Sequence, residues 1–409
     1  MMKFKRKDID KKTGVRSGIF KPNHNPFLTP KRILVSTELN YKPKVKELGI
    51  NIDYPHELFL AQIKIDAKSL WMRDNDYYNS VVKQAQRYLG SDIARKTCIF
   101  KPLLGVYIRE RQEDGRYKKK FKQLHTLSLQ LDGEQKNRII RSVVQMTDDA
   151  DYDGIVLPYF HNIFRLNNFN ENLKTAQSYA LNQLTSGIEI MPILPHTDNI
   201  VDFEKALSDF QDKNQEGVIC IPSASSVRYR FTHNSIKDFS LNDKSEKIGL
   251  MCIDTPRKHP SKPVSHPHYT LLQGYDIVAR KIRLPFLRED GKGSNDKEVE
   301  EIRKFNYKKL SIDLFNKQFL FDMSKVDTSC QPFTKFTHKE LFREADKNKL
   351  LDVVLKVMEA FDSYKEMGDC QPYIASSEFT DYLKIKASLK EAYEKDFSNK
   401  QMGLGDYFA

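Results

Sequence analysis

The sequence is poor in cysteine, and this scarcity excludes two common kinds of site. Its 409 residues contain five cysteines, and no two of them form a CxxC pair. A thiolate zinc site and a dithiol redox motif both need closely spaced pairs, so we exclude them. An odd number of cysteines without a secretory signal favours reduced thiols in an intracellular protein.

Long apolar runs are missing as well. The opening stretch "MMKFKRKDIDKKTGVRSG" is basic, but no apolar segment follows it, so it does not match a signal peptide. No apolar run approaches the length of a membrane span. We therefore expect no membrane partner and a cytoplasmic or nucleoid-associated location, or a nuclear one in a eukaryote.

Acidic residues are outnumbered, and this imbalance points to a class of partner. Lys and Arg total 67 against 55 Asp and Glu, which leaves a net charge of +12. Such a surplus favours polyanions, most often nucleic acid or an anionic membrane. A lysine-rich proteome is the alternative explanation. The hydrophobic fraction of 39% is that of a globular protein.

A regular alternation of helical and strand patterns begins at residue 133. Helical segments alternate with the short apolar strands "DGIVLPYF", "GIEIMPILP", "EGVICIPSAS" and "KIGLMCID". This alternation is typical of βα units on a parallel sheet that is buried on both faces. With earlier strands expected at 32–37 and 56–65, the pattern predicts an α/β fold with a (β/α) barrel-like body. An open doubly wound sheet is the alternative, although no GxGxxG supports a dinucleotide site.

A β-hairpin is expected over residues 102–131. Asp114-Gly115 is a strong tight-turn signal between its two strands. The returning strand is basic, and the lysines that we expect to contact nucleic acid are Lys118, Lys119, Lys120 and Lys122. A ribbon of this kind can follow a phosphate backbone, or its lysines can protect an edge strand against unwanted pairing.

The rest of the chain divides by composition. We expect a basic N-terminal arm with little regular structure before the barrel, and a charged linker and a mostly helical lobe after it. The predicted segments are the arm over 1–30, the barrel-like domain over 31–287, a mobile loop or linker over 288–301, the helical lobe over 302–396 and a tail over 397–409.

Polar and ionisable residues follow strand after strand in the alternating region. Active sites of parallel barrels lie at the carboxyl ends of the strands, so these residues are candidates for chemistry. One chemistry is phosphodiester hydrolysis by a divalent metal. Its candidate ligands are His161, His196, Asp198, His266 and His268. No HExxH supports this site, and Asp198 could instead cap the following helix.

The second chemistry is attack by a carboxylate. Asp254 ends an apolar strand, and Asp132 ends the returning stretch of the hairpin, so the first could be a nucleophile and the second its acid/base partner. This pairing resembles the tRNA-guanine transglycosylase family, in which an aspartate at a strand end attacks a nucleoside and a second aspartate contacts the base. The resemblance implies base exchange in a barrel. The family's cysteine-rich zinc site is missing here, and Asp254 could be only a turn residue before Pro256.

Arginines near two of these strand ends are further candidates for nucleic-acid binding. In "SSVRYRF", Arg228 and Arg230 flank Tyr229, and Arg257 lies three residues after Asp254. Arginine binds phosphate in a bidentate manner, and aromatic rings stack on bases. An additional strand with alternating faces would give the same pattern around Tyr229.

The final residues "QMGLGDYFA" carry a recognisable spacing. Gln401 is followed by Leu404 and then by Tyr407 and Phe408. This resembles the peptide by which client proteins bind the PCNA-type sliding clamp. Leu404 lies three and four residues before the two aromatics, so all three can share one side of a helical turn. The resemblance implies a clamp partner and an archaeal, eukaryotic, viral or plasmid source. A tail packed on its own body is the alternative.

These observations together predict an intracellular DNA-metabolism protein. Its barrel would carry out base exchange or modification on nucleic acid, and its tail would tether it to the clamp. The alternatives are a metal-dependent nuclease or repair endonuclease, a non-catalytic clamp-binding adaptor or inhibitor, and an RNA-modifying enzyme. A divalent metal is the cofactor that the nuclease alternative calls for.

Overall fold

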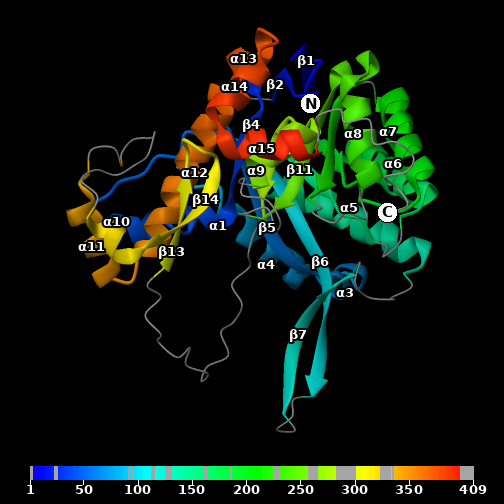
Figure 1. Cartoon of the computed structure of the whole chain (residues 1–409). Helices are drawn as coiled ribbons and strands as arrows, with labels where there is room; N and C mark the ends of the chain where they lie inside the picture. The colour runs from blue at the N-terminus through cyan, green and yellow to red at the C-terminus, as the bar shows by residue number, and fades with distance from the viewer. Residues whose placement is uncertain are drawn as a thin grey trace.

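The computed structural model of the chain describes most residues between Lys3 and Asp396 (Figure 1). The described ranges are 3–22, 26–90, 93, 96–111, 116–124, 131–160, 164–184, 187–214, 216–223, 230–256, 266–281, 301–322, 333 and 336–396. The predicted tail and almost all of the predicted linker over 288–301 lie outside these ranges.

Eight parallel strands form the centre of the molecule. They are β4 (Lys31–Val35), β5 (Leu58–Asp66), β6 (Thr97–Arg111), β8 (Gly154–Leu157), β9 (Glu189–Pro192), β10 (Gly217–Pro222), β11 (Ile248–Thr255) and β12 (Ile277–Arg280). Each strand pairs with its neighbour in the chain, and β12 returns to pair with β4. The remaining seam, between β9 and β10, is spanned by a single parallel bridge, Ile193 to Cys220. This nearly closed ring confirms the predicted barrel-like fold.

The barrel strands are buried on both faces, which explains their continuous apolar sequences. Along β6, Ile99 packs with the interior residues, whereas Phe100 packs with the outer core beneath the helices. The same alternation on β5 places Leu60 inside and Phe59 outside. The sequence of such a strand is a continuous apolar run and not an alternation of apolar and polar residues, because neither face contacts water.

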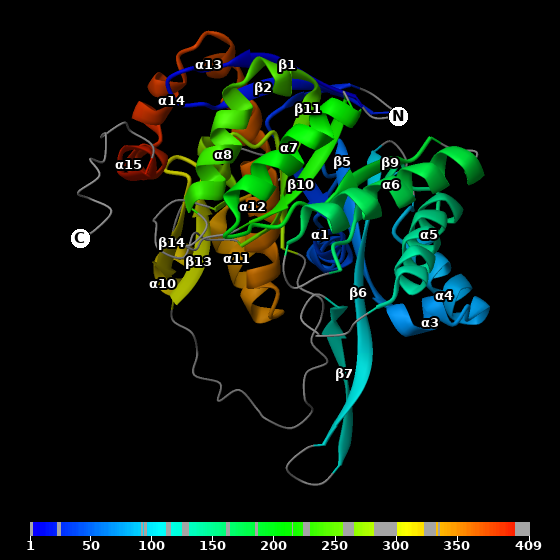
Figure 2. The same ribbon diagram turned by 90° about the vertical axis from the view of Figure 1, so that its right-hand side faces the viewer.

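Helices follow most of the barrel strands and cover the outside of the ring (Figure 2). They are α1 (Ser36–Leu39), α2 (Lys42–Lys46), α3 (Ala67–Trp71), α4 (Asn75–Gln86), α5 (Gly133–Asp149), α6 (Leu166–Gln183), α7 (Ile200–Asn214), α8 (Arg230–Leu241) and α9 (His266–Tyr269), with 3-10 turns at Asp243–Lys247 and Thr270–Gln273. Helices α5, α6, α7 and α8 pack side by side in chain order. No described helix is long and apolar enough to cross a membrane.

The predicted hairpin is present as an extension of β6. Strand β7 (Tyr117–Gln123) returns antiparallel along the far half of β6, and the ribbon projects away from the barrel (Figure 1). The return strand is shorter than expected, since β7 ends at Gln123 and residues 125–130 lie outside the described ranges.

The N-terminal segment differs from the expected arm, because it forms a three-stranded antiparallel sheet. Its strands are β1 (Lys3–Ile9), β2 (Arg16–Lys21) and β3 (Phe27–Thr29). Phe4, Phe20 and Phe27 pack with the barrel interior. The ring of Phe4 lies so close to Gly18 that a Cβ there would come within 2.5 Å of it. The sheet therefore covers the amino-terminal end of the barrel.

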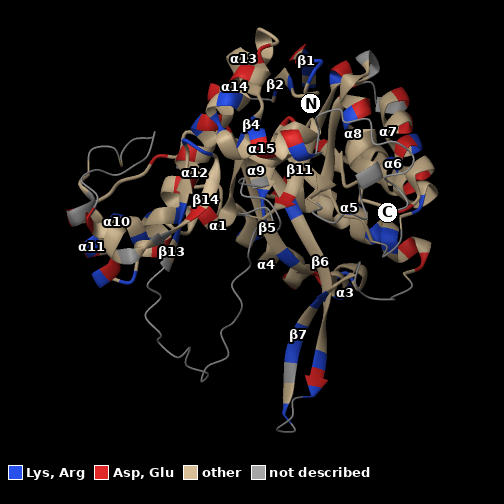
Figure 3. Ribbon diagram, in the orientation of Figure 1, with Lys and Arg blue, Asp and Glu red and all other residues tan. Residues whose placement is uncertain are grey.

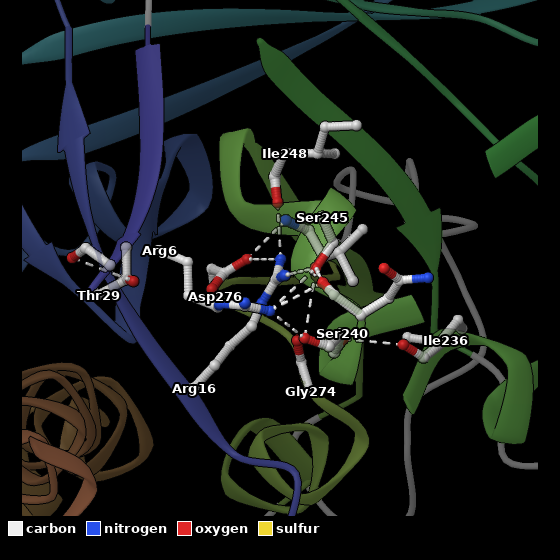
Figure 4. A network of polar contacts seen from close by, with 12 residues as sticks. Arg6, Arg16, Thr29, Ile236, Ser240, Ser245, Ile248, Gly274 and Asp276 are labelled. Atoms are coloured by element: carbon white, nitrogen blue, oxygen red, sulfur yellow. Dashed lines mark hydrogen bonds and ion pairs between the residues drawn. The ribbon is translucent and has the colours of Figure 1, made fainter. Parts of the chain in front are cut away.

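A buried arginine joins this sheet to the barrel (Figure 4). The guanidinium of Arg16 forms an ion pair with Asp276, immediately before β12, and donates to the carbonyl of Ile248 at 2.8 Å. The same carboxylate accepts from the amide of Leu250 at 2.7 Å. Because both charged side chains are fully buried, the charge of each is compensated by the other instead of by water.

The C-terminal region begins with a hairpin and continues as helices. Strands β13 (Glu301–Asn306) and β14 (Ser311–Asn316) were not expected in a helical lobe. They are followed by α10 (Lys317–Asp322), α11 (His338–Lys347), α12 (Leu351–Asp369), α13 (Gln371–Ala375), α14 (Phe379–Ile385) and α15 (Ala387–Asp396). Helix α12 packs on β4 and shares the outer core of the barrel, so the helical region completes the ring of helices.

Buried charges fix α12 at the seam between β12 and β4. Arg32 of β4 pairs with Glu38 and donates to the backbone carbonyl of Ala360. Arg280, at the end of β12, lies 3.2 Å from Glu359 of α12. Each of these groups is matched by one of opposite charge, which is the arrangement that buried ions require.

We expect loss of the Phe4 ring to destabilise the whole barrel. Phe4 is almost fully buried, whereas Leu28 of the same sheet is 41% exposed. Phe4→Ala should lower the free energy of unfolding by about 3–5 kcal/mol, because it leaves a cavity at the base of the barrel. The matched substitution Leu28→Ala should change it by less than about 1 kcal/mol. Urea titration followed by circular dichroism measures both, and equal effects would contradict the role of the sheet as a cover.

Candidate active site at the mouth of the barrel

An ion pair crosses the carboxyl-terminal mouth of the barrel. Lys101 lies on β6 and Asp254 on β11, and three strands separate these two in either direction around the ring. Their side chains nevertheless meet, with 2.5 Å between the lysine Nζ and the aspartate Oδ1. The pair therefore spans the mouth from opposite sides, above the apolar interior.

The backbone of β11 changes direction to bring Asp254 to this position. Met251 and Ile253 face the interior, so regular alternation would turn residue 254 outward. Asp254 instead adopts a left-handed conformation with φ of 60°, at an irregularity in the pairing of β11 with β12. Pairing resumes beyond it, where the Thr255 hydroxyl donates to the carbonyl of Ala279 at 2.9 Å. Left-handed residues and bulges concentrate at functional sites, where they re-aim a side chain.

Lys101 occupies an inward-facing position that is otherwise apolar. It has the same parity along β6 as Ile99, and Gln62 of β5 is its register partner. Gln62 is also buried, so two polar side chains lie side by side near the top of the interior. Cys220 is buried close to Lys101 and Asp254, and burial raises the pKa of its thiol, which keeps it protonated.

The two partners of the ion pair differ in their contact with solvent. The Lys101 side chain is 6% exposed and that of Asp254 is 37% exposed. Among the described residues, no hydrogen bond joins the second carboxylate oxygen of Asp254 to another group. The ammonium therefore holds one oxygen of a carboxylate that is itself partly exposed. This is the geometry of a positioned nucleophile or proton acceptor.

Asp132, the predicted partner of Asp254, has a contact of its own at the start of α5. Its carboxylate accepts from the amide of Gln135 at 2.7 Å, and the Gln135 side chain returns a bond to the amide of Asp132. This is a capping box. Asp132 is exposed, and no contact between it and Asp254 is present in the described part of the chain. Its predicted acid/base role stays a prediction.

The predicted metal ligands do not converge where they are described. His196 follows β9, and its Nε2 lies 2.8 Å from the carbonyl of Pro222 while its Nδ1 lies 2.8 Å from the hydroxyl of Thr232. The carbonyl can only accept, so Nε2 carries the proton and Nδ1 accepts from Thr232. Both ring nitrogens are thus engaged within the protein.

The other described metal candidates lie beside His196 or on α9. His268 on α9 is fully buried and stacks on Phe305, with 5.5 Å between the ring centroids. Asp198 lies in the loop before α7, His266 begins α9, and His161 is outside the described residues. In the described ranges, no group of three His, Cys, Asp or Glu side chains could hold a metal ion.

The predicted nucleic-acid contacts lie mainly on the hairpin. Lys119 and Lys120 are exposed on β7, and Lys122 is half-buried there. For two others only the backbone position is described: Lys118 lies on β7, and Arg230 is the first residue of α8. Arg228 and Arg257 lie outside the described residues, as do the predicted clamp contacts Gln401, Leu404, Tyr407 and Phe408.

Lys101 and Gln62 do not fit the sequence pattern of polar residues that follow strands. Both lie within strands, at inward positions one layer below the mouth. The available signal was a charged residue inside an apolar run, in "CIFKPLLG". A buried lysine needs a counter-charge, so that residue alone predicts an acidic partner elsewhere in the barrel.

Burial lowers the pKa of His196 to about 3, and this shift makes stability depend on pH. In the unfolded chain, His196 binds a proton as the pH falls through 6.5. In the folded protein its ring stays neutral down to about pH 3. The neutral His196 ring therefore makes its full contribution to the free energy of unfolding above pH 6.5, and this contribution decreases as the pH falls from 6.5 toward 3. The difference in unfolding free energy between wild type and His196→Gln should shrink by about 2 kcal/mol from pH 7.5 to pH 5. A difference that stays constant over this range would contradict a buried neutral His196.

Comparison with known proteins adds no family assignment. No model of a known protein family matches the chain, and no curated protein sequence matches it significantly. Its function must therefore be inferred from the geometry of the barrel mouth and of the hairpin beside it.

Proposed function

We propose that the protein is a nucleic-acid base-exchange enzyme of the transglycosylase type, with Asp254 as its nucleophile. The observation that carries the proposal is the position of Asp254 at the barrel mouth, held by Lys101 in a left-handed backbone conformation. Five other non-glycine residues in the described part of the chain have a positive φ, but they lie in turns or where helices end, whereas Asp254 has it inside a barrel strand. The conformation costs of order 1–3 kcal/mol.

The reaction that we propose balances without an external oxidant or reductant. An oxygen of the Asp254 carboxylate attacks C1′ of a nucleotide, and the glycosidic bond breaks as the C–O bond forms. The departing base takes the bonding electrons and a proton from an acid, for which Asp132 is the predicted residue. A free base then attacks C1′, the carboxylate leaves, and the incoming base returns a proton to the conjugate base of that acid.

Lys101 has a positioning role in this proposal. Its ammonium is almost fully buried and contacts Oδ1 of Asp254, so it fixes the carboxylate above the apolar interior. Gln62, its register partner, is a second polar group at the same level of the barrel, with both an amide donor and a carbonyl acceptor for a base.

The basic hairpin and the net charge of +12 support a polymeric substrate over a free nucleoside. The hairpin projects from the same end of the barrel at which Asp254 lies, and Lys and Arg recur along both of its strands (Figure 3). A basic ribbon beside an active site can bind phosphates and retain the strand during exchange.

The spacing of Gln401, Leu404, Tyr407 and Phe408 supports a tether to a PCNA-type sliding clamp. Such a tether raises the effective concentration of the enzyme on DNA that is being copied or repaired. The two parts of the proposal are independent, because the clamp peptide would determine where the protein acts and the barrel would determine which reaction it catalyses.

Replacing the nucleophile should abolish base exchange. Asp254→Asn should lower the rate of labelled guanine incorporation into DNA or tRNA by roughly 10³-fold or more, because an amide oxygen is a poor nucleophile. The substitution leaves Lys101 buried without a counter-charge, which alone costs about 3–5 kcal/mol. The double variant Asp254→Asn, Lys101→Met removes that charge and should recover stability without recovering exchange.

Two results would contradict the assignment of Asp254. The first is full exchange activity in a folded Asp254→Asn variant. The second is recovery of exchange, along with stability, in the double variant. Exchange by the wild type that persists in excess EDTA would further separate this mechanism from a metal-dependent nuclease.

The clamp tether predicts a simple binding difference. Wild-type protein should recover the sliding clamp in a pull-down, and the variant Tyr407→Ala, Phe408→Ala should not, because the aromatic pair is the hydrophobic anchor. Equal recovery by both proteins would refute the tether. The substitution should leave base exchange on short oligonucleotides unchanged, which makes this test independent of the barrel chemistry.

A further inference from the structure

The two faces of the β6–β7 hairpin differ in composition. Directly paired residues of an antiparallel ribbon project on the same side, so the register assigns each residue to a face. One face, here called the ladder face, carries the cross-strand pairs Tyr107–Phe121, Arg109–Lys119 and Arg111–Tyr117. The opposite face, here called the lysine face, carries Val106–Lys122 and Ile108–Lys120, with Glu110 next along β6.

Within the paired residues of β6 and β7 given above, the acidic side chain is Glu110, which is on the lysine face. Glu110 lies 2.9 Å from the Nζ of Lys120 and 3.4 Å from that of Lys122. These two contacts hold the pKa of Glu110 below its usual value, so the carboxylate stays ionised beside them. The lysines that first suggested nucleic-acid binding are therefore partly compensated by a charge within the hairpin itself.

The ladder face carries cations and aromatic rings. Arg109 and Lys119 are exposed and lie directly opposite each other, a pairing of like charges that weakens a ribbon. No acidic residue occupies the ladder-face positions of β6 from Gly105 onward or of β7. An arrangement that costs stability and concentrates positive charge is explained by an anionic partner.

The aromatic rings on this face are accessible for stacking. Tyr117 is 68% exposed and Tyr107 is 40% exposed. Tyr107 packs against Phe121 with 5.1 Å between centroids, and the ammonium of Lys119 lies 4.8 Å from the Tyr107 ring. Glycine at position 105 permits this packing, since a Cβ there would come within 2.5 Å of the Phe121 ring.

The ladder face continues the inward-facing side of β6. Ile99, Lys101 and Tyr107 have the same parity along the strand, so the residues that line the barrel and those of the ladder face lie on one side of β6. Tyr107 lies six positions beyond Lys101, about 20 Å along an extended strand. The ladder face thus lies on the same side of β6 as the proposed catalytic lysine, with Leu103 and Gly105 between Lys101 and Tyr107.

We infer that the ladder face binds an unpaired nucleic-acid strand and guides it toward the barrel mouth. This inference deepens the proposed function and rests on it for the direction of the strand, but not for the binding itself. Exposed rings at this spacing stack on the faces of bases, while Arg109, Arg111 and Lys119 contact phosphates. In a duplex the base faces are already stacked on one another, so an intact duplex could use the cations but not the rings.

The test compares charge-matched substitutions on the two faces of the full-length protein. Binding is followed by fluorescence anisotropy with a labelled dT12 strand and with a blunt duplex of the same length. The ladder-face double variant is Arg109→Ala, Lys119→Ala, and the lysine-face double variant is Lys120→Ala, Lys122→Ala. Each double variant removes two positive charges. We expect the ladder-face substitutions to weaken dT12 binding at least 10-fold. They should also reduce the slope of log K against log salt concentration by about 1.4. The lysine-face substitutions should weaken dT12 binding less than 3-fold. Equal weakening by the two pairs would overturn the inference.

A second pair of variants separates stacking from charge. Tyr107→Leu, Phe121→Leu keeps apolar packing in the ribbon but removes both rings, and should weaken dT12 binding about 10-fold or more while leaving duplex binding unchanged. Tyr107→Phe keeps the ring and should bind as the wild type does, provided thermal unfolding shows every variant to be folded. Duplex binding tighter than dT12 binding, or no effect of removing both rings, would refute an unpaired strand as the occupant.

The outcomes distinguish this inference from the proposed function. The binding assay is run on the Asp254→Asn, Lys101→Met variant as well, which keeps the hairpin but lacks the proposed nucleophile. If dT12 binding by this variant depends on the ladder-face residues and the wild type shows no base exchange, the catalytic proposal is refuted and the binding surface is supported. Base exchange by the wild type with no effect of ladder substitutions on binding would remove only the binding surface.

Discussion

Closure of the parallel sheet is the constraint on which the rest of the structure depends. Eight strands pair in chain order, and the last seam is joined through Cys220, whose carbonyl accepts from the amide of Leu194 at 2.8 Å. Closure brings the carboxyl ends of all the strands to one mouth. Without it, Lys101 and Asp254 would lie on strands too far apart in the sheet to meet.

The two ends of the barrel are built for different tasks. At the base, the N-terminal sheet inserts Phe4, Phe20 and Phe27, and the buried pair of Arg16 and Asp276 joins this sheet to the barrel. That end is closed to solvent by apolar packing. At the mouth, the interior ends in polar groups, and the long β6 continues outward as the hairpin. This asymmetry is why both proposals concern the same end of the molecule.

Sequence patterns predicted the barrel well, because its strands are buried on both faces and alternate with long helices. The N-terminal sheet was missed, since its strands are short and interleave lysines with the buried phenylalanines. Asp254 could be named from its place after a strand, but its contact with Lys101 joins residues 153 positions apart. Asp132 illustrates the converse, because a carboxylate before a helix has the same sequence pattern whether it caps or catalyses.

The central claim is that a carboxylate at the barrel mouth attacks nucleic acid. The most direct measurement is peptide mass spectrometry of the wild-type protein after incubation with a DNA or RNA strand and rapid acid quenching, in the absence of a free base. A covalent intermediate should then accumulate, and the account predicts a nucleotide-modified peptide with the modification on Asp254. A modification on a different residue, or base exchange that proceeds with no modified peptide at all, would contradict it.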